Sequence, residues 1–236
     1  MRAFGWLLRR ELQHYFITPI APVTIAVFWA ASGFFFSFNA LFVSAVDMVT
    51  AFHNMSLLLM LMMPLLSMRT LAEERQADTL ELLLTLPLGE GAIVLAKYLA
   101  LLVVLVTMLA GSTVVIVPLA LYGAPDYGPI IGGYLGVLVL GAAFAAIGVC
   151  ASSLSTNQVV AAVVTWAALL LTWFIDYAAA LDPLGGAARW LQHVSFSVQY
   201  IDLIRGVLSR EALVWFGSVV IVMLVCAVQL LRWRRL

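Results

Sequence analysis

The chain has 236 residues, of which 64% are apolar and 10% carry a formal charge, and its formal net charge is zero. Its mean hydropathy of +1.09 means that the chain has more apolar surface than the core of a soluble protein could bury. The composition therefore excludes a soluble globular protein and predicts an integral membrane protein. Long unbroken apolar segments favour spanning helices over a β-barrel, whose strands alternate in polarity.

The positions of the charged residues predict six membrane-spanning helices. A helix needs about 20 apolar residues to cross a bilayer. The longest uncharged stretch, between Asp126 and Asp176, holds two such spans separated by the polar run 152–158. We expect a single all-α transmembrane domain over residues 1–236, with spans at about 20–38, 49–68, 93–121, 129–151, 159–175 and 212–231.

An amphipathic helix is predicted before the first span, over residues 1–16. Its apolar side chains fall at helical spacing, opposite Arg2, Arg9 and Gln13: they are Phe4, Leu7, Leu8, Leu12, Tyr15 and Phe16. This pattern predicts an interfacial helix that lies along the inner face of the membrane. Pro19 predicts a break before the first span, although the helix could also simply continue that span.

Methionines and glycines mark two of the spans. Thioethers can bind copper(I), but no Cys or His accompanies the methionines of the second span at ligand spacing. We therefore expect them to serve packing and predict no metal site. The methionines are Met48, Met55, Met60, Met62, Met63 and Met68.

In the fourth span Gly132 and Gly136 allow close approach of another helix, within the chain or between chains.

The segment between the second and third spans is predicted to hold a short helix outside the membrane. Asp78 and Glu81 have the spacing of a capping box, with Asp78 accepting backbone donors at the helix start. Pro87 ends the helix, which leaves about residues 79–86. This helix is apolar nearly all round, so something must cover it. Its leucines are Leu80, Leu82, Leu83, Leu84 and Leu86.

The charges around this helix bear on what covers it. They are net acidic, which favours a basic groove of a partner protein over anionic lipid headgroups. An interfacial or re-entrant hairpin without a partner remains the alternative. Glu74 and Arg75 lie where the second span meets the helix, and a charge pair there could make the two move as one body. The charges are Glu73, Glu74, Arg75, Asp78 and Glu81.

The segment from 176 to 211 predicts one or two amphipathic helices at the outer face, between the fifth and sixth spans. Its apolar residues at helical spacing are Leu191, Val194, Val198 and Ile201, with Arg189, Gln192, Gln199 and Asp202 elsewhere. The segment could act as an outer gate, as a dock for a periplasmic partner, or only as a lid over the bundle.

Arginine and lysine predict the orientation, because cytoplasmic loops carry the excess of these residues. An even number of spans puts both termini on one side. With the termini inside, the cytoplasmic set is much the larger one, so we expect both termini in the cytoplasm. That set is Arg2, Arg9, Arg10, Arg69, Arg75, Lys97, Arg232, Arg234 and Arg235, against Arg189, Arg205 and Arg210 outside.

Several functions are excluded by what the sequence lacks. No span has an ionisable residue near its centre, which argues against coupling to an ion gradient. Lys97 is the only lysine and does not end a phosphate-binding loop, so any ATPase must be another polypeptide. No serine elbow, paired intramembrane aspartates or H-E-x-x-H pattern supports an enzyme. Haem ligation by His53 and His193 is conceivable, but lone interfacial histidines are more often polar surface groups.

Several motifs resemble a known family. Around the cytoplasmic loop stand Pro64-Leu65-Leu66-Ser67-Met68-Arg69, Ala72-Glu73-Glu74-Arg75, Thr79-Leu80-Glu81-Leu82-Leu83, Pro87 and Lys97-Tyr98-Leu99-Ala100. The opening of the chain has Glu11-Leu12, Tyr15-Phe16, Thr18-Pro19-Ile20-Ala21 and Gly33-Phe34-Phe35-Phe36, and the late segment 196–207 holds Tyr200, Asp202, Arg205 and Gly206. Together they resemble permeases of ABC-2-type transporters, most closely the branch with the gliding-motility permease GldF and the copper-processing permease NosY.

The resemblance implies the membrane half of an ATP-driven exporter in the bacterial inner membrane. Residues 79–86 would be the coupling helix that docks on a separate ATPase, and the loop with Ser153, Thr156 and Asn157 would be a second contact. Tyr200, Asp202, Arg205 and Gly206 become candidates for an outer gate. The family commonly has Gly where this chain has Asp78; aspartate tolerates the turn geometry.

The implied partners are two copies of the ATPase, a second permease copy or paralogue, membrane lipid, and a periplasmic or GldG-like accessory protein. ATP and Mg²⁺ would bind the ATPase, so we expect no cofactor and no catalytic residue on this chain, and no nucleic-acid partner. The alternative function is a membrane anchor for an ATPase-powered assembly or motility complex that transmits force without moving a solute.

Overall fold

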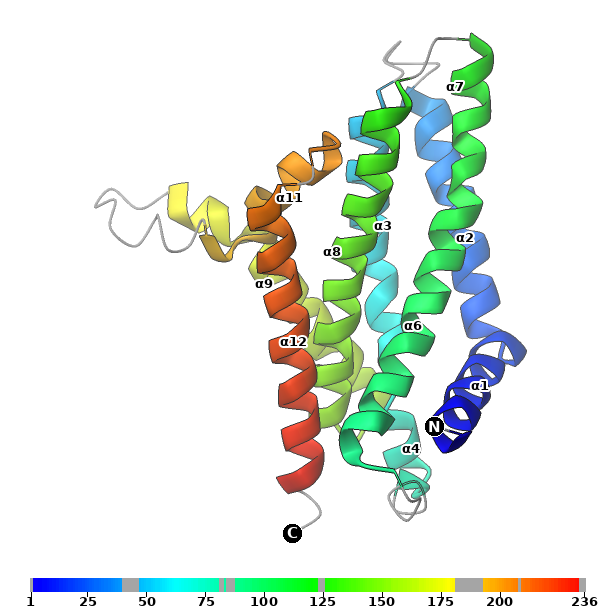
Figure 1. The fold of residues 1–236 in the computed structure, drawn as a ribbon, viewed down its shortest axis with the longest axis vertical. Helices are drawn as coiled ribbons and strands as arrows, with labels where there is room; N and C mark the ends of the chain where they lie inside the picture. The colour runs from blue at the N-terminus through cyan, green and yellow to red at the C-terminus, as the bar shows by residue number, and fades with distance from the viewer. Residues whose placement is uncertain are drawn as a thin grey trace.

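The computed structural model describes residues 2–39, 47–80, 83, 88–122, 126–180, 193–207 and 209–233. Within these residues, six helices are long and apolar enough to cross a membrane, as predicted. They belong to one bundle, seen in Figure 1. Their bounds are α2 (Ile20–Phe38), α3 (Met48–Ser67), α6 (Glu90–Ser112), α8 (Tyr127–Leu154), α9 (Gln158–Ala180) and α12 (Arg210–Trp233).

Shorter helices complete the described part of the chain. The third predicted span is interrupted near its far end, because α6 passes into the 3₁₀ turn η2 (Thr113–Val115) before α7 (Ile116–Tyr122). The remaining short elements are α1 (Arg2–Ile17), α4 (Ala72–Gln76) and α11 (Phe196–Ile204). In Figure 1, α1, α4 and the end of α12 lie at one end of the bundle, here called the basal end, and α7 lies at the other.

Polar side chains begin several helices. Asp47 Oδ1 accepts from Val49 N at 3.0 Å at the start of α3, and Asp126 Oδ1 accepts from Gly128 N at 3.1 Å at the start of α8. Asn157 Oδ1 accepts from Val159 N at 2.8 Å at the start of α9. Each bond satisfies a backbone donor that has no partner within the first turn of its helix.

Helix α8 forms the centre of the bundle, since it packs on α3, α6, α9, α11 and α12. Small residues make this possible. A Cβ added at Gly132 would lie 2.6 Å from the carbonyl oxygen of Gly206, and one at Gly136 would lie 2.8 Å from Leu203 Cβ. The Gly132–Gly136 pair therefore serves a contact inside the chain, against the segment that includes α11.

The methionines of α3 lie in the interior, as expected for packing residues. Met55, Met60, Met62 and Met63 belong to the main apolar core. Among the residues that the structure describes, no three His, Cys, Asp or Glu side chains gather where they could hold a metal ion.

Helix α1 is amphipathic and separate from α2, with Pro19 at the break, as predicted. Its apolar face does not simply rest on lipid. Leu7 is fully buried in a small core with Leu83, Ile93 and Ala96, while Arg9 and Gln13 are exposed. The helix is therefore docked on the protein, mainly on α6.

Helix α11 lies in the segment predicted to hold amphipathic helices. Of the apolar residues at helical spacing, Val194, Val198 and Ile201 are 48%, 39% and 41% exposed, while Leu191, like Arg189 and Gln192, lies outside the described residues. The buried side is Phe196, Tyr200, Leu203 and Ile204. Aromatic packing explains why this side is buried, because the Phe196 ring meets those of Phe144, Trp215 and Phe216 at centroid distances of 5.7, 5.1 and 5.6 Å.

Candidate functional site

Buried charges gather at the basal end, where α1, α4 and α6 meet. Lys97 of α6 is 1% exposed. Its Nζ lies 3.1 Å from Glu11 Oε1 of α1 and 2.9 Å from Glu74 Oε1 of α4. We call Glu11, Lys97 and Glu74 the ion triad. The ion triad connects α1 and α4, which do not span the membrane, to the spanning helix α6.

The ion triad carries more negative than positive charge within its three members. The Arg10 guanidinium approaches Glu74 Oε1 from the surface at 4.0 Å, which offsets part of that excess. Glu74 Oε2 is buried, and the described residues offer it no hydrogen-bond partner. Because an unpaired buried charge is costly, the triad is most sensitive to loss of Lys97, whereas loss of one carboxylate leaves Lys97 paired with the other.

A second group of polar contacts lies beside the ion triad. Arg69 binds Glu73 through two nitrogens, at 2.8 and 2.7 Å, and its Nη1 donates to Thr18 Oγ1 at 3.2 Å. The Tyr15 hydroxyl donates to the carbonyl oxygen of Leu66 at 3.1 Å. Burial, and secondarily the nearby Glu11 carboxylate, raise the pKa of Tyr15 well above its usual range, so this donor stays protonated.

The end of α8 and the turn that follows it hold α4 from the other side. Ser152 Oγ accepts from Leu71 N and Ala72 N at 3.0 and 2.9 Å, which satisfies backbone donors at the start of α4. Arg75 Nη1 donates to the carbonyl oxygen of Ser155 at 3.1 Å. Glu74 and Arg75 thus do not form the single charge pair that the sequence suggested. They connect α4 in opposite directions, to α6 and to the α8–α9 turn.

Asp78, the predicted cap of the following helix, closes the preceding helix α4, and its predicted capping-box partner Glu81 lies outside the described residues. Its φ is +54°, a left-handed conformation. Thr79 N donates to the Glu74 carbonyl at 2.9 Å and Asp78 N to the Arg75 carbonyl at 3.2 Å, the pattern that closes a helix at its C-terminus. Asp78 therefore ends α4, and Thr79 O accepts the next helical bond, from Leu83 N at 3.1 Å. Glycine adopts this left-handed conformation easily, which explains why the resembling permeases commonly have glycine where this chain has Asp78.

The structure provides a third covering for the leucine segment, besides lipid or a partner. Leu83 is 3% exposed and packs with Leu7 of α1 and with Ile93 and Ala96 of α6. Leu80 lies partly buried against the same group. The other predicted members of the coupling helix, Glu81, Leu84 and Pro87, fall outside the described residues.

The exposed surface next to this cluster is polar. Gln76, Ala77, Asp78 and Thr79 are exposed at the end of α4. Of the predicted second contact, Thr156 and Asn157 are exposed, whereas Ser153 is buried and donates to the Cys150 carbonyl at 2.6 Å. The Arg75–Ser155 bond brings the two exposed stretches together. We call residues 76–79 with Thr156 and Asn157 the basal tip.

The outer gate candidates separate into two pairs. Tyr200 is 1% exposed, and its hydroxyl is hydrogen-bonded to Ser56 Oγ of α3. Gly206 has φ +81° and packs against Pro129 at the start of α8. Asp202 and Arg205 are exposed on the other side of this segment. The structure thus places Tyr200 and Gly206 in helix contacts and the two charged residues at the surface.

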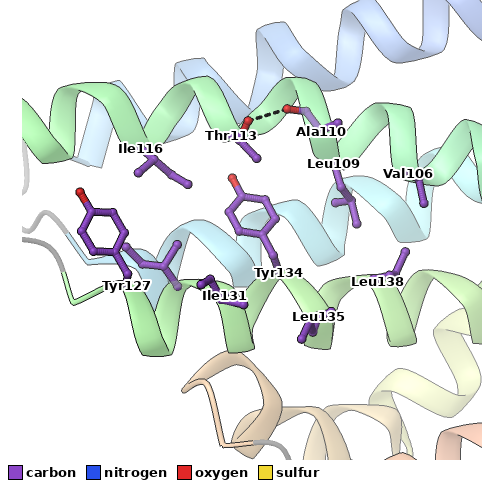
Figure 2. Close-up of a pocket in the computed structure, with 11 residues that line it drawn as sticks. Val106, Leu109, Ala110, Thr113, Ile116, Tyr127, Ile131, Tyr134, Leu135 and Leu138 are labelled. Carbon is purple, nitrogen blue, oxygen red and sulfur yellow. Dashed lines mark hydrogen bonds between the residues drawn. The ribbon is translucent and has the colours of Figure 1, made fainter.

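An apolar groove of about 400 Å³ lies between α6, α7 and α8, away from the basal end. Figure 2 shows Tyr134 and Leu138 of α8 facing Leu109 and Ile116 across it. Thr113 Oγ1 is turned to the Ala110 carbonyl at 2.6 Å. Among the residues that the structure describes, no charged side chain lines this groove, so it offers an occupant mainly van der Waals contact.

Six apolar helices with their ionic contacts gathered at one end define a multi-pass helical membrane protein. The family model described as ABC-2 family transporter protein matches residues 16–231, and the chain belongs to this family. It is accordingly a membrane permease component of an ABC exporter, and the family implies pairing with an ABC ATPase subunit. A comparison with curated proteins finds no match to the chain.

Sequence reasoning missed the ion triad and the Ser152 contact. Glu11 stood only at the edge of an uncharged stretch, and its helical spacing with Leu7 and Tyr15 was the one available signal that it faces inward. A carboxylate on the apolar face of an amphipathic helix requires a buried cation, and Lys97 is the only lysine in the chain. This reasoning could have paired the two residues.

Proposed function

We propose that the basal tip is where the ATPase docks and that the ion triad passes its motion into the membrane. The observation that carries the proposal is the position of Glu74. It lies in the short helix that ends at the exposed tip, and its carboxylate lies 2.9 Å from the buried Lys97 of α6. A displacement of the tip therefore reaches a spanning helix through one ion pair.

The contacts on both sides of α4 support rigid transmission. Arg75 and Ser152 connect α4 to the α8–α9 turn, while Glu74 connects it to α6, and through Lys97 to α1. Helix α8 is the central element of the bundle. Two copies of the ATPase, which bind ATP and Mg²⁺, would close on each other and shift the tips of two permease subunits as rigid bodies.

The proposed orientation follows from the basic residues at the basal end. The arginines of α1 and α4 and the end of α12 lie there, so this end faces the cytoplasm of a bacterial cell and the α11 end faces outward. Tyr200 and Gly206 then hold the outer segment closed over the bundle through their contacts with α3 and α8. A substrate exported by the permease would leave by this side.

The docking surface is tested with variants that spare the interior. Gln76→Arg combined with Thr156→Arg adds two positive charges to the exposed tip, which we expect to repel a basic groove of the ATPase. The variant should insert normally but retain little ATPase in a pull-down from mild detergent. His193→Arg, exposed on the segment before α11, is the matched control and should retain the ATPase. Equal retention by both variants would exclude the basal tip as the dock.

A further inference from the structure

A second groove lies between α6 and α12 at the basal end, separate from the ion triad. Its volume is about 350 Å³. Its walls are apolar: Val94 and Leu95 on α6, and Leu224, Val225 and Val228 on α12. The side chains of Leu95 and Val225 are 43% and 52% exposed, so the groove opens onto the surface that the spans present to lipid.

The polar groups of this groove stand at one end. Gln229 and Arg232 lie at the basal end of α12, and Gly91 lies in the first turn of α6. Glu90 Oε2 lies 3.7 Å from Arg232 Nε and holds the guanidinium at the groove mouth. The Arg232 side chain is still 56% exposed, which leaves it accessible to a phosphate group.

The length of the groove matches one leaflet of a bilayer. From Leu224 to Arg232 a helix rises about 12 Å at ~1.5 Å per residue, and half of a hydrocarbon core is about 15 Å. An occupant that fits must therefore be apolar along most of one leaflet and anionic at the membrane surface.

We propose that this groove is a binding site for an anionic glycerophospholipid. One acyl chain lies between α6 and α12, and the phosphate oxygens accept hydrogen bonds from Arg232. The site does not depend on ATPase docking at the basal tip, because none of its residues belongs to the ion triad or to the tip. The bound lipid fills the gap between two spanning helices and so contributes to their packing.

Glycine positions offer a test that spares the fold. A Cβ added at Gly91 meets no atom within 4 Å, so Gly91→Leu fills the groove without an internal clash. Gly217 on α12 also has nothing within 4 Å, and Gly217→Leu is the matched control outside the groove. For the headgroup, Arg232→Gln is compared with Arg210→Gln at the opposite end of the same helix.

The experiment uses the full chain, delipidated in mild detergent and titrated with phosphatidylglycerol or phosphatidylcholine, with bound lipids counted by native mass spectrometry. Arg232→Gln should lower the affinity for phosphatidylglycerol by about tenfold, the effect of losing a charged hydrogen bond, and leave phosphatidylcholine binding unchanged. Gly91→Leu should lower the binding of both lipids, and both controls should bind as the natural chain does.

Three results would overturn the proposal. The first is equal phosphatidylglycerol affinity of Arg232→Gln and Arg210→Gln. The second is no preference of the natural chain for phosphatidylglycerol over phosphatidylcholine. The third is a Gly91→Leu variant that changes the oligomeric state in the same spectra while its lipid count stays constant, which would assign the groove to a second copy of the chain.

Discussion

Replacing Lys97 with Met tests the ion triad most directly. The substitution keeps an unbranched side chain of similar length but leaves the Glu11 and Glu74 carboxylates facing each other in a buried place, without the ammonium 3.1 and 2.9 Å away. Breaking a buried ion pair by removing one partner costs about 3–5 kcal/mol. For a chain of this size about 1 kcal/mol corresponds to a shift of roughly 2–4 °C in the unfolding midpoint.

We therefore expect Lys97→Met to lower the apparent midpoint by roughly 6–20 °C, measured by intrinsic fluorescence of the full chain in detergent. The triple variant Lys97→Met, Glu11→Leu, Glu74→Leu should recover most of the loss, because no charge is then left unpaired. Arg232→Gln breaks the exposed pair with Glu90 and is the control, with an expected change of about 0–1 kcal/mol.

The reasoning fails if Lys97→Met unfolds no earlier than Arg232→Gln. It also fails if the triple variant is as unstable as the single one, because the instability would then come from lost packing rather than from unpaired carboxylates.

Three further predictions concern coupling, packing and orientation. Glu74→Ala should leave the permease assembled with an ATPase that hydrolyses ATP but abolish the cellular process that the transporter drives; normal complementation in cells would contradict the role given to Glu74. Gly132→Ala should destabilise the chain by about 1–3 kcal/mol in thermal unfolding, because its Cβ would lie 2.6 Å from the Gly206 carbonyl oxygen, whereas Gly217→Ala has open space and should not. In a chain whose two natural cysteines are replaced, a cysteine at Gln76 should be labelled only from the cytoplasm and one at Gln192 only from outside, and the reverse labelling would invert the orientation.

Expectations drawn from the sequence were most accurate for the spans and weakest for side-chain partners. The break at Pro19 and the helical character of the segment around α11 follow from local signals and agree with the structure. The sequence did not indicate which face of α11 is buried, because valines and isoleucine at helical spacing competed with an aromatic face. Only the rings of Phe144, Trp215 and Phe216, from distant parts of the chain, decided between the two faces.

At the basal end, too, the sequence predicted the local elements but not the side-chain partners. The sequence marked the stretch from Glu73 to Asp78 as charged and the segment after it as an apolar helix in need of cover. It could not indicate that α1 covers Leu83, that Ser152 satisfies the first donors of α4, or that Asp78 closes that helix with a left-handed turn. These contacts depend on which elements, distant in the sequence, the fold brings together at the basal end.

The sequence by itself determined a six-span helical membrane protein, because the number and length of spans depend on local runs of apolar residues that must match the bilayer. Tertiary structure alone decided the contacts of the ion triad. Glu11, Glu74 and Lys97 lie on three different elements, and a buried charge takes whichever opposite charge the packing of those elements brings within reach. The same packing makes Lys97, near one end of a spanning helix, the residue that joins α1, α4 and α6.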